Sequence, residues 1–87
     1  MFCVYILLCA DSKFYIGFTS DLRKRIQQHK NGEVFATRPR RPVRLIFYEC
    51  YLDKYDALRR VKYLKTSKGK TTLKSMLKEF LHKQEKS

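Results

Sequence analysis

Two apolar runs near the N-terminus, residues 2–9 and 14–18, are separated only by the short segment 10–13. Both runs are rich in β-branched and aromatic residues, a composition typical of strands. A short turn between two such strands favours an antiparallel hairpin. Because the first run is apolar almost throughout, we expect it to form a strand that is buried on both faces.

The register of this hairpin decides which side chains meet, because side chains alternate along a strand. One register pairs Cys9 with Lys13. It places Tyr5 opposite Gly17, with Tyr15 as the diagonal neighbour of Tyr5 on the same face. A shift by one residue would separate the two tyrosines. In the first register both phenols lie within reach of one phosphate, and Gly17 leaves that face open for a ligand or a backbone.

A helix is predicted to follow, from Ser20, a suitable N-cap, to about Lys30. The Asn–Gly pair directly after it is a natural C-terminal stop. Apolar residues recur at helical spacing along this segment. Arg25 and His29 lie one turn apart on the face that would cover the hairpin, so both are candidates for a site next to the tyrosines.

The second half of the chain is predicted to add one strand and two helices. Residues 43–51 have the composition of a strand, and Asp53 is expected to cap the helix that follows. Residues 67–70 would end that helix. The last helix would begin at Thr71 or Thr72 and carry a stripe of apolar residues that packs on the core.

The predicted order of elements is β-β-α-β-α-α. This order indicates an α+β fold in which a small three-stranded antiparallel sheet is flanked by helices. At 87 residues the chain has room for one modest hydrophobic core. We therefore expect a single domain over residues 1–84 and a frayed tail at residues 85–87.

The charge of the chain limits the class of its partner. The chain has 20 Lys and Arg residues against 8 Asp and Glu, a formal net charge of +12. This excess favours a polyanion, with DNA as the expected partner and RNA as the alternative. The apolar run at residues 2–9 is far too short to span a bilayer, and we expect no membrane partner. The candidate nucleic-acid contacts are Gly17, Lys24, Arg38, Arg40 and Arg41.

Three cysteines, at positions 3, 9 and 50, bear on the compartment of the protein. They are odd in number and lack CxxC spacing, which favours neither a disulfide framework nor a zinc site. All three lie in apolar runs. We therefore expect reduced core thiols in a cytoplasmic protein.

The strings Cys3-Val4-Tyr5 and Tyr15-Ile16-Gly17, followed by Arg25 and His29, resemble the GIY-YIG nuclease family. That family is defined by Gly-Ile-Tyr and Tyr-Ile-Gly on adjacent strands, with an arginine and then a histidine on the first helix. The first tripeptide is degenerate in this chain and the second is intact. The resemblance covers about residues 1–80, and the length and the Arg-Pro loop are similar to those of the small stand-alone bacterial members.

The resemblance implies an endonuclease that hydrolyses phosphodiester bonds of DNA with one divalent metal ion, Mg²⁺ or Mn²⁺. By position, Tyr5 would be the general base or would position the attacking water, and Tyr15 would orient that water. Arg25 would neutralise charge on the scissile phosphate, and His29 would assist proton transfer or hold a phenol. A planar guanidinium suits phosphate oxygens. A phenol with its ordinary pKa of about 10 needs a stabilised anion before it can act as a base at neutral pH.

The chain departs from the family at the position of the metal ligand. The family places a metal-binding glutamate in a pattern like Arg-Glu-Lys after the third strand, and here the string is Arg60-Val61-Lys62. Valine cannot ligate a hard cation, which takes oxygen donors, so Glu49 is the nearest other candidate. Either the metal binds elsewhere, or the chain is catalytically weak, or the residue has been altered. The alternative function is a non-catalytic nucleic-acid-binding module with the same fold.

Overall fold

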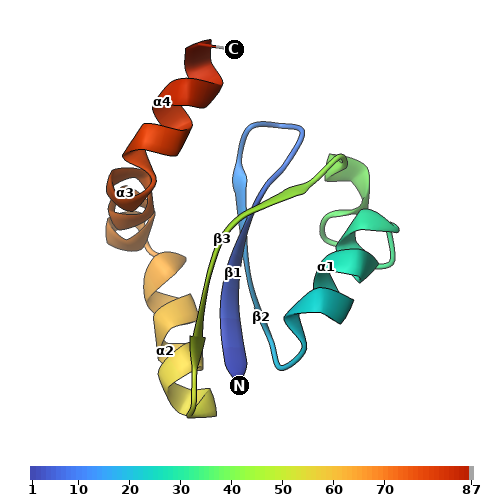
Figure 1. Cartoon of the computed structure of the whole chain (residues 1–87), viewed down its shortest axis with the longest axis vertical. Helices are drawn as coiled ribbons and strands as arrows, with labels where there is room; N and C mark the ends of the chain where they lie inside the picture. The colour runs from blue at the N-terminus through green and yellow to red at the C-terminus, as the bar shows by residue number, and fades with distance from the viewer. Residues whose placement is uncertain (87) are drawn as a thin grey trace.

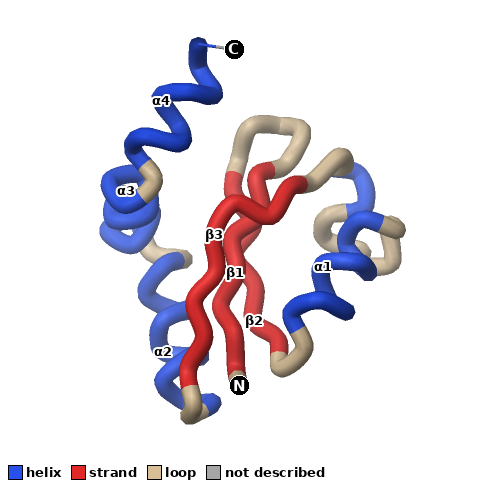
Figure 2. Tube along the Cα trace, viewed as in Figure 1, coloured by secondary structure: helices blue, strands red, loops and turns tan. Residues whose placement is uncertain are grey.

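A three-stranded antiparallel sheet lies at the centre of the computed structural model, which describes residues 1–86 (Figures 1 and 2). Its strands are β1 (Phe2–Leu8), β2 (Phe14–Thr19) and β3 (Arg44–Tyr51), in the order β2-β1-β3. The central position of β1 explains its continuous apolar sequence, because both of its faces are covered. The predicted hairpin and third strand are confirmed.

Helices cover the two faces of the sheet. The first, α1 (Leu22–Lys30), lies on one side, and α2 (Lys54–Leu64), α3 (Ser67–Met76) and α4 (Lys78–Lys86) follow one another on the other side (Figure 1). A short 3-10 turn, η1 (Arg38–Arg40), interrupts the loop between α1 and β3. The fold is α+β, as predicted, with one more helix than expected. No helix within the described residues combines the length and the apolar character needed to cross a membrane.

Alternate residues of β1 belong to two separate hydrophobic clusters, one on each face of the sheet. Val4 and Ile6 point towards α2 and α3, whereas Tyr5 and Leu7 point towards α1. The cluster on the α2 face consists of Val4, Ile6, Ile16, Ala57, Val61, Leu64 and Leu73. The cluster on the α1 face consists of Tyr5, Leu7, Cys9, Ile26 and Val43. The buried polar side chains, His29 and Thr37, lie on the α1 face.

The caps of the first two helices follow the expected chemistry, although one cap differs by a residue. Asp53 caps α2, as predicted, by accepting a hydrogen bond from the N–H of Tyr55 at 2.8 Å. Asp21, and not Ser20, is the N-cap of α1, and its carboxylate accepts from the N–H of Lys24 at 3.2 Å. Oγ1 of Thr19, two residues before the cap, accepts a hydrogen bond from the N–H of Asp21 and so holds the cap in place.

Residues 67–70 begin a helix, whereas the sequence predicts that they end one. Thr66 caps α3 by accepting from the N–H of Gly69 at 3.0 Å, so α3 begins before either of the threonines expected to start it. A Cβ at Gly69 would collide with the backbone of α2 at Tyr63, so the glycine permits a close approach of the two helices. The apolar stripe expected in one helix is divided at Leu77, which separates α3 from α4.

The expectation of three reduced thiols is wrong for two of them. Cys3 and Cys50 are direct partners in the pairing of β1 with β3, their Cα atoms lie 4.0 Å apart, and they form a disulfide. Cys9 is free and buried. The pairing joins residues 47 apart in sequence, so it depends on a strand register that cysteine spacing does not reveal. Because two of the three cysteines are oxidised, the cysteines no longer support the expected cytoplasmic location.

Candidate active site

The β1–β2 hairpin has the register that brings the two tyrosines together. The N–H of Cys9 donates to the carbonyl of Lys13 at 3.0 Å, and Tyr5 lies opposite Gly17. The rings of Tyr5 and Tyr15 are neighbours on one face, with centroids 6.4 Å apart. The predicted register is confirmed.

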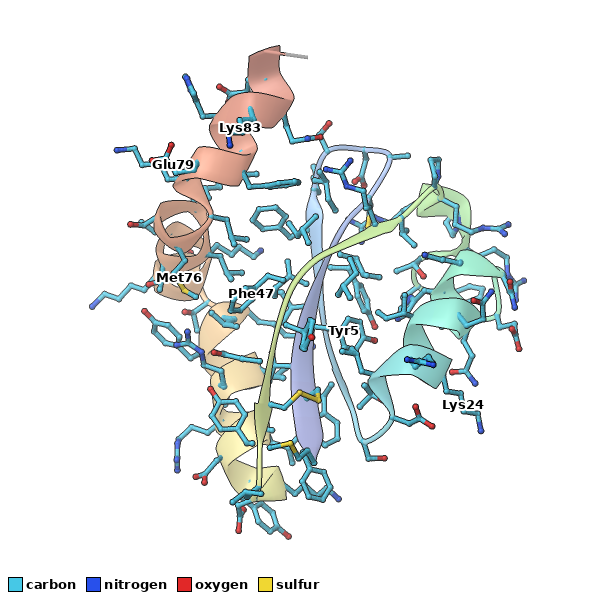
Figure 3. The ribbon with its side chains drawn as sticks, in the orientation of Figure 1. Tyr5, Lys24, Phe47, Met76, Glu79 and Lys83 are labelled. Carbon is cyan, nitrogen blue, oxygen red and sulfur yellow. A yellow bond between two sulfur atoms is a disulfide. The ribbon has the colours of Figure 1, made fainter. Side chains whose placement is uncertain are left out.

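Gly17 does not leave open space for a ligand, as the sequence led us to expect. A Cβ at this position would overlap the phenol of Tyr5, whose ring lies across the glycine. Figure 3 shows Tyr5 between the sheet and α1. The missing side chain is therefore used by the tyrosine itself. The buried Gly17 lets Tyr5 reach α1 instead of exposing a nucleic-acid contact.

The helix α1 supplies an imidazole directly above this hairpin. The hydroxyl of Tyr5 lies 2.7 Å from Nε2 of His29, in a buried hydrogen bond. The His29 ring also meets the ring of Tyr15 edge-on, with centroids 5.1 Å apart. The two tyrosines and the histidine thus form one cluster, and the Arg25 guanidinium lies beside Tyr5, so the four predicted groups lie together. Their catalytic roles stay predictions.

Thr37 completes this cluster, and sequence reasoning missed it. Its Oγ1 lies 2.7 Å from Nδ1 of His29, and both residues are 0% exposed. Both ring nitrogens of His29 therefore have partners, one from the sheet and one from the loop after α1. A threonine within a basic loop carries no local signal for such a contact, because the contact depends on how the loop folds back over the helix.

The protonation states in the cluster follow from burial and from Arg25. Burial raises the pKa of Tyr5, and the Arg25 guanidinium beside it opposes that rise. Burial lowers the pKa of His29, and repulsion from Arg25 adds to this. At neutral pH the phenol and the imidazole are both uncharged. In the tautomer that carries its proton on Nδ1, the Tyr5 hydroxyl donates to Nε2 and Nδ1–H donates to Oγ1 of Thr37.

Exposure divides the site into two layers. Tyr5 is only 1% exposed and His29 is fully buried, so both lie beneath the surface. Tyr15 and Arg25 are half-buried and reach solvent. The Arg25 guanidinium donates to Oε1 of Gln28 at 3.2 Å, a contact that leaves further N–H groups for a ligand. An approaching phosphate would meet Arg25 and Tyr15 first.

Tyr48 is a second residue of this face that the sequence did not single out. It is the direct partner of Tyr5 in the pairing of β1 with β3, so the two side chains share a face. Unlike Tyr5, it is 54% exposed. The strand alternation of residues 43–51 would have identified it once the β1–β3 register was known.

Neither Val61, which stands at the position of the family's metal-binding glutamate, nor Glu49, the other candidate ligand, lies in this site. Val61 is buried in the cluster on the α2 face of the sheet. Glu49 lies opposite Val4 on that same face and forms an ion pair with Arg60 at 2.6 Å. Within residues 1–86, no group of three His, Cys, Asp or Glu side chains could hold a metal ion. Phenols, an imidazole with both nitrogens bonded and a guanidinium do not suit a hard divalent cation.

The arginines of the loop are more firmly held than the sequence suggests. Arg40 forms an ion pair at 2.9 Å with Asp11, which lies in the turn between β1 and β2 and not in the loop itself. Arg38 donates from Nε to the carbonyl of Gly32 at 2.7 Å, and Arg41 donates from Nε to the carbonyl of Arg38 at 3.1 Å. Arg38 and Arg41 are exposed, as is Lys24 on the outer side of α1 (Figure 3).

Comparison with known proteins gives consistent matches. The GIY-YIG catalytic domain family matches residues 1–75. A UPF0213 protein of Bacillus pumilus is 43% identical over 63 residues, which are 71% of this chain and 64% of that protein. A UPF0213 protein of Staphylococcus saprophyticus is 39% identical over 72 residues, which are 82% of this chain and 88% of that protein.

A solved structure shares the fold. The solution NMR structure of a UPF0213 protein from Bacillus halodurans has a TM-score of 0.57 and 35% sequence identity, and the match covers 87% of this chain and 85% of that one. The chain spans a little less than two thirds of the relatives from Bacillus pumilus and Lacticaseibacillus paracasei, 64% and 62% of their lengths.

Proposed function

Because the chain belongs to the GIY-YIG family of nuclease domains, we propose that it is an endonuclease that hydrolyses phosphodiester bonds of DNA. The observation that supports this most directly is the 2.7 Å bond between the Tyr5 hydroxyl and His29, beneath the half-buried Tyr15 and Arg25. These groups can bind an anion and accept a proton next to it. The net charge of +12 adds attraction for a polyanion.

Arg25 binds the scissile phosphate and stabilises the negative charge that develops on it. Tyr15 orients the attacking water. The water gives one proton to Oη of Tyr5 while the Tyr5 proton passes to Nε2 of His29, so no free phenolate forms. The hydroxide forms a bond to phosphorus, the ester bond to the leaving oxygen breaks, and that oxygen takes a proton from solvent.

The bound phosphate itself assists the proton transfer. Without substrate, burial and Arg25 hold His29 in its neutral form. A phosphodiester brings a negative charge to Arg25, which offsets the repulsion between the guanidinium and an imidazolium. The imidazolium also keeps its bond to Thr37 through Nδ1–H. Substrate binding therefore favours the state in which His29 has accepted the proton.

A specific observation favours the second candidate, a non-catalytic nucleic-acid-binding module. The position of the family glutamate is filled by Val61 within the apolar core, and Glu49 is neutralised by Arg60. We therefore assign no ligand to the divalent ion that the family implies and route no step through it. The basic surface and the fold are compatible with binding alone.

Cleavage of end-labelled branched, nicked and plain DNA duplexes, with Mg²⁺, Mn²⁺ or a chelator, separates the two candidates. We expect cleavage by the natural chain and a loss of about 100-fold or more in Tyr5→Phe and Arg25→Ala. Tyr63→Phe removes a phenol outside the site and should keep full activity. Salt-sensitive binding with no cleavage of any duplex would leave the binding module as the function.

A further inference from the structure

The loop after α1 holds a large aromatic side chain in solvent. Phe35 is 85% exposed, although it lies between Val34, which is 8% exposed, and the fully buried Thr37. Burying a phenylalanine side chain stabilises a fold, so this exposure gives up a substantial stabilisation. A single exposed apolar residue needs no explanation by itself, and the surroundings of Phe35 decide what it can do.

The backbone around Phe35 is fixed. The N–H of Arg38 donates to the carbonyl of Val34 at 2.9 Å, and the N–H of Arg40 donates to the carbonyl of Thr37 at 2.9 Å. Thr37 is itself bonded to His29. The exposed ring is therefore carried by a folded turn anchored in the candidate active site. Ordering such a loop in advance lowers the entropic cost of binding a ligand on it.

The Arg38 side chain lines the same hollow as the Phe35 ring, and Arg41 is tied to Arg38 by a hydrogen bond from its Nε to the Arg38 carbonyl. Arg38 bonds the carbonyl of Gly32, and the Arg41 guanidinium lies so close to Gly32 that a Cβ there would collide with it. Phe35, Ala36, Arg38 and Pro39 line a shallow hollow of about 470 Å³. An apolar floor with cations at its edge suits a flat aromatic ligand that carries negative charge, which is the chemistry of a nucleotide.

We infer that this hollow binds an unpaired DNA base, which stacks on Phe35 while Arg38 and Arg41 hold the adjacent phosphates. The inference rests on the proposed function and adds the substrate class, DNA with an unpaired base next to the scissile phosphate. Two residues of chain span at most about 7 Å, so Phe35 lies close to Thr37 and hence to the Tyr5–His29 pair. The arginines and the net charge of +12 favour a nucleic acid over a second copy of this chain.

Binding to two matched duplexes tests the inference without requiring cleavage. One duplex is fully paired, and the other has a single unpaired 2-aminopurine, whose fluorescence is quenched when it stacks. We expect the natural chain to quench this base. Phe35→Ala should weaken binding to the second duplex about 5- to 150-fold and change binding to the paired duplex less than about twofold. Phe35→Trp should restore the quenching, and Leu52→Ala, at a residue 84% exposed elsewhere, should change neither.

Arg38→Ala should weaken binding to both duplexes equally and reduce the salt dependence. Equal losses on both duplexes in Phe35→Ala, or no quenching by the natural chain, would overturn the inference. Concentration-dependent self-association that Phe35→Ala abolishes would overturn it too, because a second copy would then occupy the hollow. Quenching without cleavage would instead refute the proposed catalysis and leave the base site standing.

Discussion

Alternate residues of β1 point to the two faces of the sheet, and the two faces have different roles. On the α2 face, β1 contributes Val4 and Ile6 to a cluster of aliphatic side chains. On the α1 face it contributes Tyr5, which bonds the buried His29. The first face stabilises the fold by removing apolar surface from water, and the second holds a polar network that must be fully bonded to be tolerated.

This separation clarifies the missing metal ligand. Val61 and Glu49 both belong to the stabilising face, one within the apolar cluster and the other in an ion pair with Arg60. The polar face holds the tyrosines, the histidine and Arg25. A substitution that makes one face behave like the other tests the comparison directly.

Val61→Glu should have the largest effect on stability, because it places a carboxylate among aliphatic side chains. We expect a loss of about 3–5 kcal/mol at neutral pH in urea unfolding, compared with a smaller loss in Val61→Gln. Burial would raise the pKa of the new carboxyl, so stability should be regained as the pH falls towards 5. Metal-dependent DNA cleavage gained by Val61→Glu would show that the two faces share one site.

Reduction of the Cys3–Cys50 disulfide should have the next largest effect. The bond joins β1 to β3 and closes a long loop, so its loss should cost about 2–4 kcal/mol. Thermal unfolding with and without a reductant measures this. The double variant Cys3→Ser, Cys50→Ser should unfold at the same temperature in both conditions. No shift in the natural chain would mean that the disulfide adds nothing to strand pairing.

Two glycines, one on each face, should separate stability from activity. A Cβ at Gly69 meets the backbone of Tyr63, which cannot move aside, whereas a Cβ at Gly17 meets the flexible side chain of Tyr5. Gly69→Ala should cost about 1–3 kcal/mol. Gly17→Ala should also cost stability, because it displaces Tyr5 from its buried bond to His29, and it should reduce cleavage as strongly as Tyr5→Phe. Full activity in Gly17→Ala would exclude a catalytic role for the Tyr5–His29 bond.

Local sequence patterns were sufficient for the three strands, for the first two helices and for part of the site. Strand alternation and a short turn determine the register that pairs Tyr5 with Gly17, and helical spacing places Arg25 and His29 on one face. The predicted cap was correct at Asp53, whereas Asp21 and not the predicted Ser20 caps α1. These features depend on interactions between residues close in sequence, which short patterns encode.

Contacts between distant segments were not predictable in this way. The disulfide of Cys3 requires the β1–β3 register, and the position of Thr37 requires the folded loop. The start of α3 at Ser67 depends on how closely Gly69 approaches α2. In each case tertiary packing selected among options that the local sequence left open.

Thr37→Val should sharpen the view that the polar face must be fully bonded. The substitution keeps the shape of the side chain and removes the partner of Nδ1 of His29, so it should cost about 1–2 kcal/mol. It should also lower kcat more than it changes KM, because the imidazolium loses its second bond. Thr37→Ser should restore both. If Thr37→Val unfolds like the natural chain, the hydrogen bond has no structural role.

The smallest effect concerns pH, and it again separates the two faces. Burial and Arg25 lower the pKa of His29 in the folded protein, so the unfolded chain binds more protons than the folded one just below neutrality. The stability contributed by the neutral, buried imidazole is therefore fully present above the unfolded pKa of about 6.5 and is lost as the pH falls through and below that value. Urea unfolding between pH 5 and 8 should show this fall. In His29→Gln the curve should be flatter, whereas Leu73→Ala, on the α2 face, should lower stability equally at every pH. An unchanged pH dependence in His29→Gln would mean that neither burial nor Arg25 lowers the pKa of His29 in the folded protein.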